Sequence, residues 1–229
     1  GTATPERAAA AACASPVKWV GGKTSLLPQL VRRMPVDALG AGTADWRYFE
    51  PFAGGAALFF HLAHPRATLS DTNEELITTY RALALQTDGV IEALRQLETE
   101  HKRARDADAF YYAQRAGWNK SRHRWSTIHM AAVFLYLNRT CWNGVWRVNR
   151  AGDFNVPVGR YKNPTICDEA RLRAAGKVLR RATLAATRWQ IAILPARPGD
   201  LVYFDPPYLP ISATSSFTGY GKLPFGPAH

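Results

Sequence analysis

One short segment near the end of the chain limits the fold more than any other feature. It is the apolar run Leu201–Phe204, which is followed at once by Asp205, Pro206 and Pro207. A short apolar run bounded by turn residues predicts a buried strand. The two prolines fix φ and remove two backbone donors, so neighbouring carbonyls face outward without local partners. The sequence therefore predicts a strand that ends in a carboxylate and unpaired carbonyl groups.

These groups, with Tyr208 next in the chain, suit the binding of a flat ring that carries an amino group. Asp205 and a nearby carbonyl can accept both hydrogens of an NH₂ group, and Tyr208 can stack on the ring. Adenine and cytosine both fit that description. The alternative reading is a strand end followed by an Asp turn and a Pro-Pro loop, since short motif matches carry false positives.

The rest of the chain predicts an α/β core that carries an insertion. Further strands are expected at 48–49 and 67–71, and helices at 24–34, 56–64, 127–139, 168–180 and through most of 74–117. A long basic and aromatic stretch separates the early strands from Leu201. Glu50, Asp71 and Asp205 each follow a predicted strand, so the three acids could meet at one sheet edge, where such folds bind ligands.

Two features between the first strands have competing interpretations. The turn Pro51–Gly55 allows close backbone approach to a nucleotide-like ligand, or it is only a tight turn. Asp71 stands where an acid commonly binds ribose hydroxyls, or it caps Asn73 and the helix that follows. Neither feature decides between its two readings alone.

The charge balance favours a polyanionic partner. The chain has 29 Lys and Arg against 18 Asp and Glu, a net charge of +11. Nucleic acid is the commonest such partner, although a generally basic proteome would give the same excess. The cations gather in Lys102–Arg124 and Arg139–Lys162, interleaved with aromatic residues. That mixture suits phosphate contacts combined with base stacking.

Several classes of protein are disfavoured. No run of about 18 apolar residues predicts a membrane span. Cys13, Cys141 and Cys167 are widely spaced, which predicts neither disulfides nor a metal site and suits the cytoplasm. The alanine-rich residues 1–15 are interpreted as a disordered tail, with a signal peptide as the alternative.

Taken in order, the motifs resemble those of one enzyme family. They are Lys18-Trp19-Val20-Gly21-Gly22-Lys23, Glu50-Pro51-Phe52-Ala53-Gly54-Gly55, Asp71-Thr72-Asn73, Leu135 to Gly144, Phe154 to Lys162, and Asp205-Pro206-Pro207-Tyr208. The chain from about Pro16 to about Phe225 resembles the Dam-type (D12 class) DNA adenine-N6 methyltransferases, which commonly modify GATC. Many relatives have glycine where this chain has Ala56.

The resemblance implies a role for each matching residue. S-adenosylmethionine would be the methyl donor, and the catalytic residues would be Asp205, Pro206, Pro207 and Tyr208. The implied cofactor-binding residues are Trp19, Lys23, Phe52, Ala53, Gly54, Gly55, Asp71 and Asp205. The implied DNA-binding residues are Lys18, Asn138, Arg139, Trp142, Asn143, Arg147, Pro157 and Arg160, with Trp142 as a wedge and Arg147 as a base reader. No metal is implied.

The resemblance also implies a fold and a domain order. We expect a Rossmann-like methyltransferase core with an inserted, mainly helical target-recognition subdomain. Residues 16–73 would form the cofactor half, 74–165 the insertion, and 166–229 a catalytic half that is incomplete, because relatives continue well past Tyr208. The protein would be bacterial or phage-encoded and would act on double-stranded DNA, in restriction–modification or in regulatory methylation.

The implied reaction is methyl transfer to N6 of a flipped-out adenine. Three alternatives come from other classes. A sequence-specific DNA-binding protein without catalysis would keep the basic region, and a cytosine-N4 or RNA-amine enzyme would use similar chemistry. A protein methyltransferase would not need the Trp142–Arg147 element.

Overall fold

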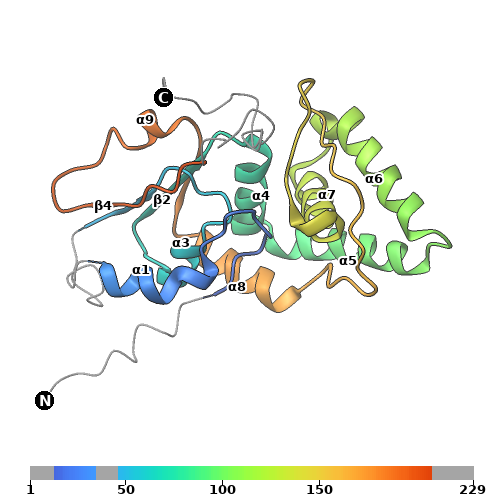
Figure 1. Ribbon diagram of the computed structural model, residues 1–229, viewed down its shortest axis with the longest axis horizontal. Helices are drawn as coiled ribbons and strands as arrows, with labels where there is room; N and C mark the ends of the chain where they lie inside the picture. Colours follow the sequence, from blue (N-terminus) through green and yellow to red (C-terminus); the bar gives the residue numbers. More distant parts are fainter. Residues whose placement is uncertain (1–12, 35–45, 208–229) are drawn as a thin grey trace, which may run out of the picture.

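The computed structural model describes residues 13–34 and 46–207, and within them a four-stranded parallel sheet organises the fold (Figure 1). The strands are β1 (Tyr48–Glu50), β2 (Ala67–Asp71), β3 (Thr183–Ala186) and β4 (Leu201–Val202), in the order β3-β2-β1-β4. Tyr48 pairs with Ala67 on one side and with Leu201 on the other. Strands β2 and β3 are thus added in turn on one side of β1, and β4 is added on the other side, as in doubly wound α/β folds. The prediction of an α/β methyltransferase-like fold is confirmed.

Helices follow β1, β2 and β3 and dominate the middle of the chain. Helix α1 (Leu27–Arg33), preceded by the 3₁₀ turn η2 (Thr24–Leu26), carries Pro28 in its first turn, where a missing N–H costs little. The others are α3 (Ala57–Leu62), α4 (Glu74–Leu85), α5 (Thr87–Arg103), α6 (Ala107–Ser121), α7 (Thr127–Thr140), α8 (Glu169–Leu179) and α9 (Trp189–Ala192), with 3₁₀ turns η3 (Arg122–Arg124) and η4 (Trp142–Gly144). Side chains of Asn73, Asp106, Ser126 and Asp168 cap α4, α6, α7 and α8, as their residue types favour.

The helical half and the sheet share one hydrophobic core. Helix α4 lies between the sheet and the group α5, α6 and α7 (Figure 1). Leu69 of β2, Tyr80 of α4 and Phe134 of α7 are all fully buried in the same cluster. Residues inserted between β2 and β3 in the sequence therefore pack continuously with the sheet. The domain boundaries themselves stay a prediction.

Most aromatic residues of the basic stretches belong to this core, which corrects their interpretation as stacking platforms. Trp118 and Trp146 are buried and pack edge-on, with ring centroids 5.5 Å apart. Trp146 also packs on Phe134, and Tyr111 is fully buried. The sequence pattern could not separate these positions from exposed ones, because burial here depends on which helices meet.

The region around β4 also differs from the structure that the sequence predicts. The predicted strand at 201–205 forms ladder pairs only at Leu201 and Val202, and both are half-buried. One further hydrogen bond, from Tyr203 N to Phe49 O, keeps the register, but Phe204 is 46% exposed. The prediction of a buried strand over 201–205 is thus wrong in both its length and its burial. Strand β3 was not predicted, because its sequence, Thr183-Leu184-Ala185-Ala186, carries little apolar patterning.

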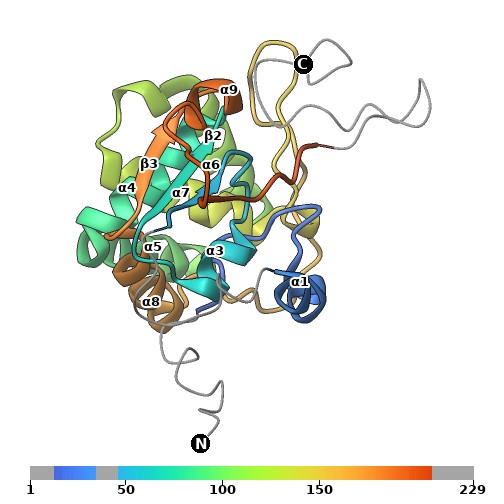
Figure 2. The same ribbon diagram turned by 90° about the vertical axis from the view of Figure 1, so that its left-hand side faces the viewer.

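The two faces of the sheet have different coverings. Tyr48 and Leu69 face the main core under α3 and α4. Phe49 points to the opposite face, where the Arg47 guanidinium lies 5.3 Å from its ring centroid. Helix α9 lies on this second side, at the end of β2 and β3 (Figure 2). No helix of the described residues is long and apolar enough to span a membrane.

Residues 16–23, here called the bridging segment, are held on α7 by a buried amide. Lys18 N donates to Asn138 Oδ1, and Asn138 Nδ2 donates to Lys18 O, both at 2.8 Å. Asn138 Nδ2 also lies 3.3 Å from Gly144 O, and Arg139 Nη2 donates to Pro16 O at 2.7 Å. Asn138 has no exposed surface. Its amide bonds the N–H and C=O groups of Lys18 in the way that a neighbouring strand would.

Replacing this amide should destabilise the protein. Asn138→Ala leaves the main chain of Lys18 and the Gly144 carbonyl without their partner, which should lower the free energy of unfolding by about 2 kcal/mol. Urea denaturation followed by tryptophan fluorescence measures the change. Asn163→Ala, at an exposed position, is the matched control and should shift the midpoint little. Equal stability of the two variants would contradict this role.

Candidate functional site

Three acidic side chains gather at the carboxyl edge of the sheet. Glu50 and Asp71 are the last residues of β1 and β2, and Asp205 lies three residues beyond β4. Strand order reverses between β1 and β4, and such switch points are where open α/β sheets bind ligands. The expectation that the strand-end acids lie at one edge is met for these three.

Asp205 is held in an ion pair with Lys23. Lys23 Nζ lies 2.6 Å from both Asp205 Oδ1 and Asp205 Oδ2, and it donates a third hydrogen bond to Gly21 O at 2.8 Å. Both side chains are mostly shielded from solvent. The pair ties the end of the bridging segment to the chain after β4. Lys23 had been predicted among cofactor-binding residues, and the structure places it on the predicted catalytic carboxylate.

Glu50 is a buried acid that the sequence marked as a strand end without giving it a role. Its Oε2 accepts hydrogen bonds from Tyr48 Oη at 2.8 Å and from Phe59 N at 3.3 Å. Burial raises the pKa of Glu50 to about 8, and repulsion by the nearby Asp205 adds to the rise, while these two hydrogen bonds oppose it. Glu50 is therefore mostly protonated at neutral pH, beside the Lys23–Asp205 pair.

The glycine turn after β1 is fixed by hydrogen bonds from two other elements. Asp71 Oδ2 accepts from Gly54 N and Asp71 Oδ1 from Asn73 N, both at 2.9 Å. Tyr80 of α4 donates to Gly54 O at 2.6 Å. Burial raises the pKa of Asp71, opposed by the backbone N–H groups that it accepts from. Asp71 thus joins the turn to the start of α4. This agrees with the interpretation that Asp71 caps Asn73, and it leaves the interpretation that Asp71 binds ribose open.

The turn needs glycine because of a tryptophan. A Cβ on Gly54 would lie 2.6 Å from Trp19 Nε1, and one on Gly55 would lie 2.9 Å from Trp19 Cβ. Gly54 also has φ +44°, and Ala56 adopts φ +48°, the left-handed region that glycine tolerates better. Close packing of the bridging segment, which the sequence did not reveal, therefore sets the residue types here. Ala53 is buried, and its N–H bonds Ser70 O.

Aromatic rings line the chain beside Asp205. Phe52, Phe204 and Trp189 form a triangle with centroid separations of 6.3 Å, 6.5 Å and 5.7 Å. Phe52 was predicted from the turn motif, whereas Trp189 was missed because α9 carries no recognisable motif. Pro206 is exposed and Pro207 half-buried. Tyr208 lies outside the described residues.

A second set of predicted residues comprises the half-buried Lys18 and five exposed residues, Trp142, Asn143, Arg147, Pro157 and Arg160, here called the exposed basic and aromatic surface. Trp142 is 50% exposed, and its N–H donates to Pro157 O at 2.9 Å. Asn143 has φ +52°, which turns the chain sharply after Trp142. Lys18 Nζ lies 4.2 Å from the ring centroid of Tyr161, a cation–π contact.

Arg147 is presented by a small hairpin. Its neighbours Trp146 and Phe154 are buried against each other, with ring centroids 4.5 Å apart. Arg147 itself points outward, and its Nε donates to Asn155 Oδ1 at 2.8 Å. This bond orients the guanidinium, a group suited to bidentate hydrogen bonding.

Asn138 and Arg139, predicted as DNA-binding residues, lie beneath this surface. Both are buried, and their side chains donate hydrogen bonds to Lys18, Gly144 and Pro16. Burial lowers the pKa of Arg139, and the Arg171 charge adds to that effect. Their placement supports a positioning role and gives no support to direct contact with DNA.

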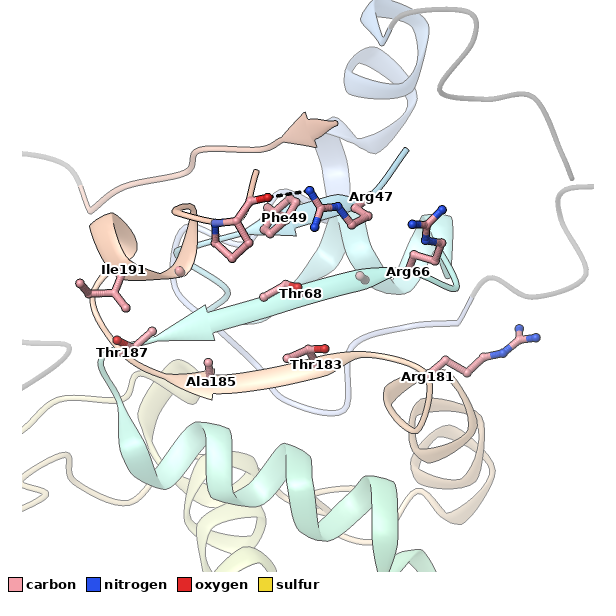
Figure 3. Close-up of a pocket in the computed structure, with 12 residues that line it drawn as sticks. Arg47, Phe49, Arg66, Thr68, Arg181, Thr183, Ala185, Thr187 and Ile191 are labelled. Atoms are coloured by element: carbon pink, nitrogen blue, oxygen red, sulfur yellow. Dashed lines mark hydrogen bonds between the residues drawn. The ribbon is translucent and has the colours of Figure 1, made fainter. Parts of the chain in front are cut away.

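A cavity of about 470 Å³ lies away from these residues, on the second face of the sheet (Figure 3). Thr68, Thr183 and Ala185 line its floor, and Arg66 and Arg181 point outward at one end. The cavity includes none of the predicted site residues. Within residues 13–34 and 46–207, no three His, Cys, Asp or Glu side chains are grouped so as to hold a metal ion.

Glu50 should make stability depend on pH. The unfolded chain releases this proton near pH 4.5, whereas the folded protein keeps it to about pH 8. Between those values the unfolded state binds fewer protons, so stability falls as pH rises. We expect a loss of roughly 2–4 kcal/mol between pH 5 and pH 8.

Urea denaturation at several pH values measures this loss. Glu50→Gln keeps an acceptor for Tyr48 and should flatten the profile over that range. Glu92→Gln, at an exposed position on α5, should keep the wild-type slope. A Glu50→Gln profile as steep as that of the wild type would rule out a buried, protonated Glu50.

Comparison with known proteins agrees with this arrangement. The family described as D12 class N6 adenine-specific DNA methyltransferase matches residues 19–229. The type II methyltransferase M.MjaIII of Methanocaldococcus jannaschii is 39% identical over 215 residues, which cover 91% of this chain and 74% of that protein. The DNA adenine methylase of Serratia marcescens is 37% identical, over 89% of this chain and 70% of its own length. The DNA adenine methylase of Escherichia coli K12 is 35% identical, with 89% and 68% covered. The chain belongs to the D12 class N6 adenine-specific DNA methyltransferases.

Proposed function

We propose that this protein transfers the methyl group of S-adenosylmethionine to N6 of adenine in duplex DNA, within GATC. One observation carries the proposal: the bridging segment contacts all three parts of the candidate site. Lys18 lies at the exposed basic and aromatic surface, Trp19 covers the glycine turn, and Lys23 pairs with Asp205. A base drawn from DNA at that surface and a methyl donor at the turn would meet at Asp205.

The residues at the turn suit S-adenosylmethionine, which supplies an electrophilic methyl on a sulfonium when bound. Asp71 accepts backbone N–H groups from Gly54 and Asn73, and Thr72 is a further backbone donor. A carboxylate offers about four acceptor sites, so one would remain for a ribose hydroxyl. Trp19, Phe52, Ala53, Gly54 and Gly55 would form the rest of the cofactor site, with Lys23 and Asp205 at its border.

Asp205 and the Pro206 carbonyl would accept the two hydrogens of the target amine. Those bonds orient the nitrogen lone pair toward the methyl group and stabilise the positive charge that develops on nitrogen during direct transfer. Pro207 keeps the chain extended and Tyr208 would stack on the base. The base must leave the helix first, because N6 is engaged in pairing.

On the DNA side, each exposed residue has a chemical role. Trp142 would enter the duplex and replace stacking that is lost when the base flips. Arg147 would read guanine by two hydrogen bonds. Lys18, Asn143, Pro157 and Arg160 would contact the backbone or neighbouring bases, while Asn138 and Arg139 would hold the surface from within.

Asp205→Ala should lower methyl transfer by about 10²–10³-fold, the usual effect of removing one stabilising group for a developing charge. Transfer of labelled methyl from S-adenosylmethionine to a GATC duplex measures the rate, and a gel-shift assay should show DNA binding largely retained. Asp108→Ala, at an exposed position on α6, is the control for loss of a carboxylate.

Full activity of Asp205→Ala would refute the assigned chemistry. A wild-type protein that binds GATC duplexes and transfers no label would instead favour the alternative, a DNA-binding protein that has lost catalysis. Equal labelling of GATC and scrambled duplexes would refute the specificity.

Arg147→Ala should relax specificity at one guanine of the site. Loss of a bidentate contact lowers discrimination by about ten- to hundredfold, measured as the ratio of kcat/KM values for GATC and for duplexes with that base changed. Arg150→Ala, at the exposed tip of the same hairpin, removes an equal charge and should weaken both duplexes alike. A change in the ratio for Arg150→Ala alone would reassign base reading to the hairpin tip.

A further inference from the structure

The Lys23 ammonium lies on the side of Asp205 where the predicted substrate amine can bind. Its nitrogen is 2.6 Å from both oxygens of Asp205, and the contact to Gly21 O uses its third hydrogen. A nitrogen that donates to both oxygens lies between them, on the open side of the carboxylate. An amine nitrogen that donates along the inner lone pair of either oxygen would approach the same side.

The two cations would also compete during the reaction. Methyl transfer places positive charge on the substrate nitrogen, and Asp205 would stabilise that charge. An ammonium that stays on the same carboxylate would repel it at close range in a partly shielded site. Lys23 must therefore withdraw from at least one oxygen as the amine arrives.

The chain around Lys23 has features that permit this movement. Its side chain has a flexible four-carbon stem. Gly21, with φ +78°, and Gly22 are exposed, and nothing lies within 4 Å of a Cβ placed on Gly21. The neighbouring Trp19 is packed on Gly54 and Gly55, so the segment is fixed at Trp19 and open beyond it.

We propose that Lys23 is a placeholder for the target amine: it pairs with Asp205 until a base enters and then yields the carboxylate to that base. Lys23 is a positioning residue. A base that cannot donate hydrogen bonds to Asp205 would not compensate for the loss of the Lys23–Asp205 pair, so it would bind less tightly. This inference rests on the proposed role of Asp205 as the amine acceptor. It differs from the role implied by the resemblance, in which Lys23 binds the methyl donor.

A thermodynamic cycle tests this competition. The dissociation constants of two GATC duplexes are measured by fluorescence anisotropy with saturating S-adenosylhomocysteine. One duplex carries adenine at the target position, and the other carries purine, which lacks the 6-amino group. The ratio of the purine to the adenine constant reports the contribution of the amine, and differences in base-pair strength cancel between protein variants.

Lys23→Met should raise this ratio about fivefold, because the amine no longer competes with the ammonium for a charge-assisted hydrogen bond. Lys23→Arg keeps a cation on Asp205 and should leave the ratio near the wild-type value. Lys18→Met is the matched control for charge: it should weaken binding of both duplexes by the same factor. Circular dichroism confirms that each variant is folded.

An unchanged or lower ratio in Lys23→Met would overturn the inference. If affinity for S-adenosylhomocysteine, measured by calorimetry, falls while the ratio stays constant, Lys23 serves the cofactor instead. Asp205→Ala separates this failure from failure of the proposed function. If Asp205→Ala lowers the ratio, Asp205 binds the amine whatever Lys23 does; if it does not, the amine-acceptor role itself is wrong.

Discussion

The two hydrogen bonds between the Asn138 amide and the main chain of Lys18 are the interaction on which the candidate site depends. They fix an irregular segment, which forms neither strand nor helix, on α7. A buried amide with all its bonds made is strongly directional, because any shift of the segment leaves polar groups unpaired. With Lys18 held, Trp19 reaches the glycine turn and Lys23 reaches Asp205. The cofactor, catalytic and DNA-facing parts are thereby joined over six residues.

The charges at the sheet edge are arranged so that Asp205 is paired with a cation, whereas its neighbour Glu50 is buried without one among the described residues. Asp205 has a cation on both oxygens, whereas Glu50 has two neutral donors on one oxygen and almost no access to solvent. Two buried anions this close would repel each other, and protonation of Glu50 removes that repulsion. Of these two neighbouring acids, Asp205 therefore faces an incoming amine beside a protonated Glu50 that supports the strand.

The positive charge of the chain serves two purposes. Arg122 is buried and bonds Glu75 on α4, and Arg139 is buried beneath the bridging segment, so both hold the structure together. Arg147 and Arg160 are exposed, as is Trp142, and Lys18 is half-buried with its ammonium over Tyr161. Only the second group can meet phosphates, so net charge alone overstates the cationic surface available to DNA.

The sequence by itself determined the α/β class, the bounds of β2 to the residue, the acids at the strand ends and the family. Period-two and helical spacing, together with glycine and proline, are local signals, and the family motifs are short runs of adjacent residues. Strand β3 and Trp189 were not predictable because their own residues carry no such signal. The burial of Asn138, Arg139 and Trp146 also depends on which helices pack together.

Only the tertiary structure decided that Gly54 and Gly55 make room for Trp19, that Glu50 keeps its proton, and that Lys23 lies on Asp205. Each of these facts joins residues at least 30 positions apart or depends on exclusion of water by distant elements. Distances and desolvation of that kind arise from packing, and the order of residues along a chain does not contain them explicitly.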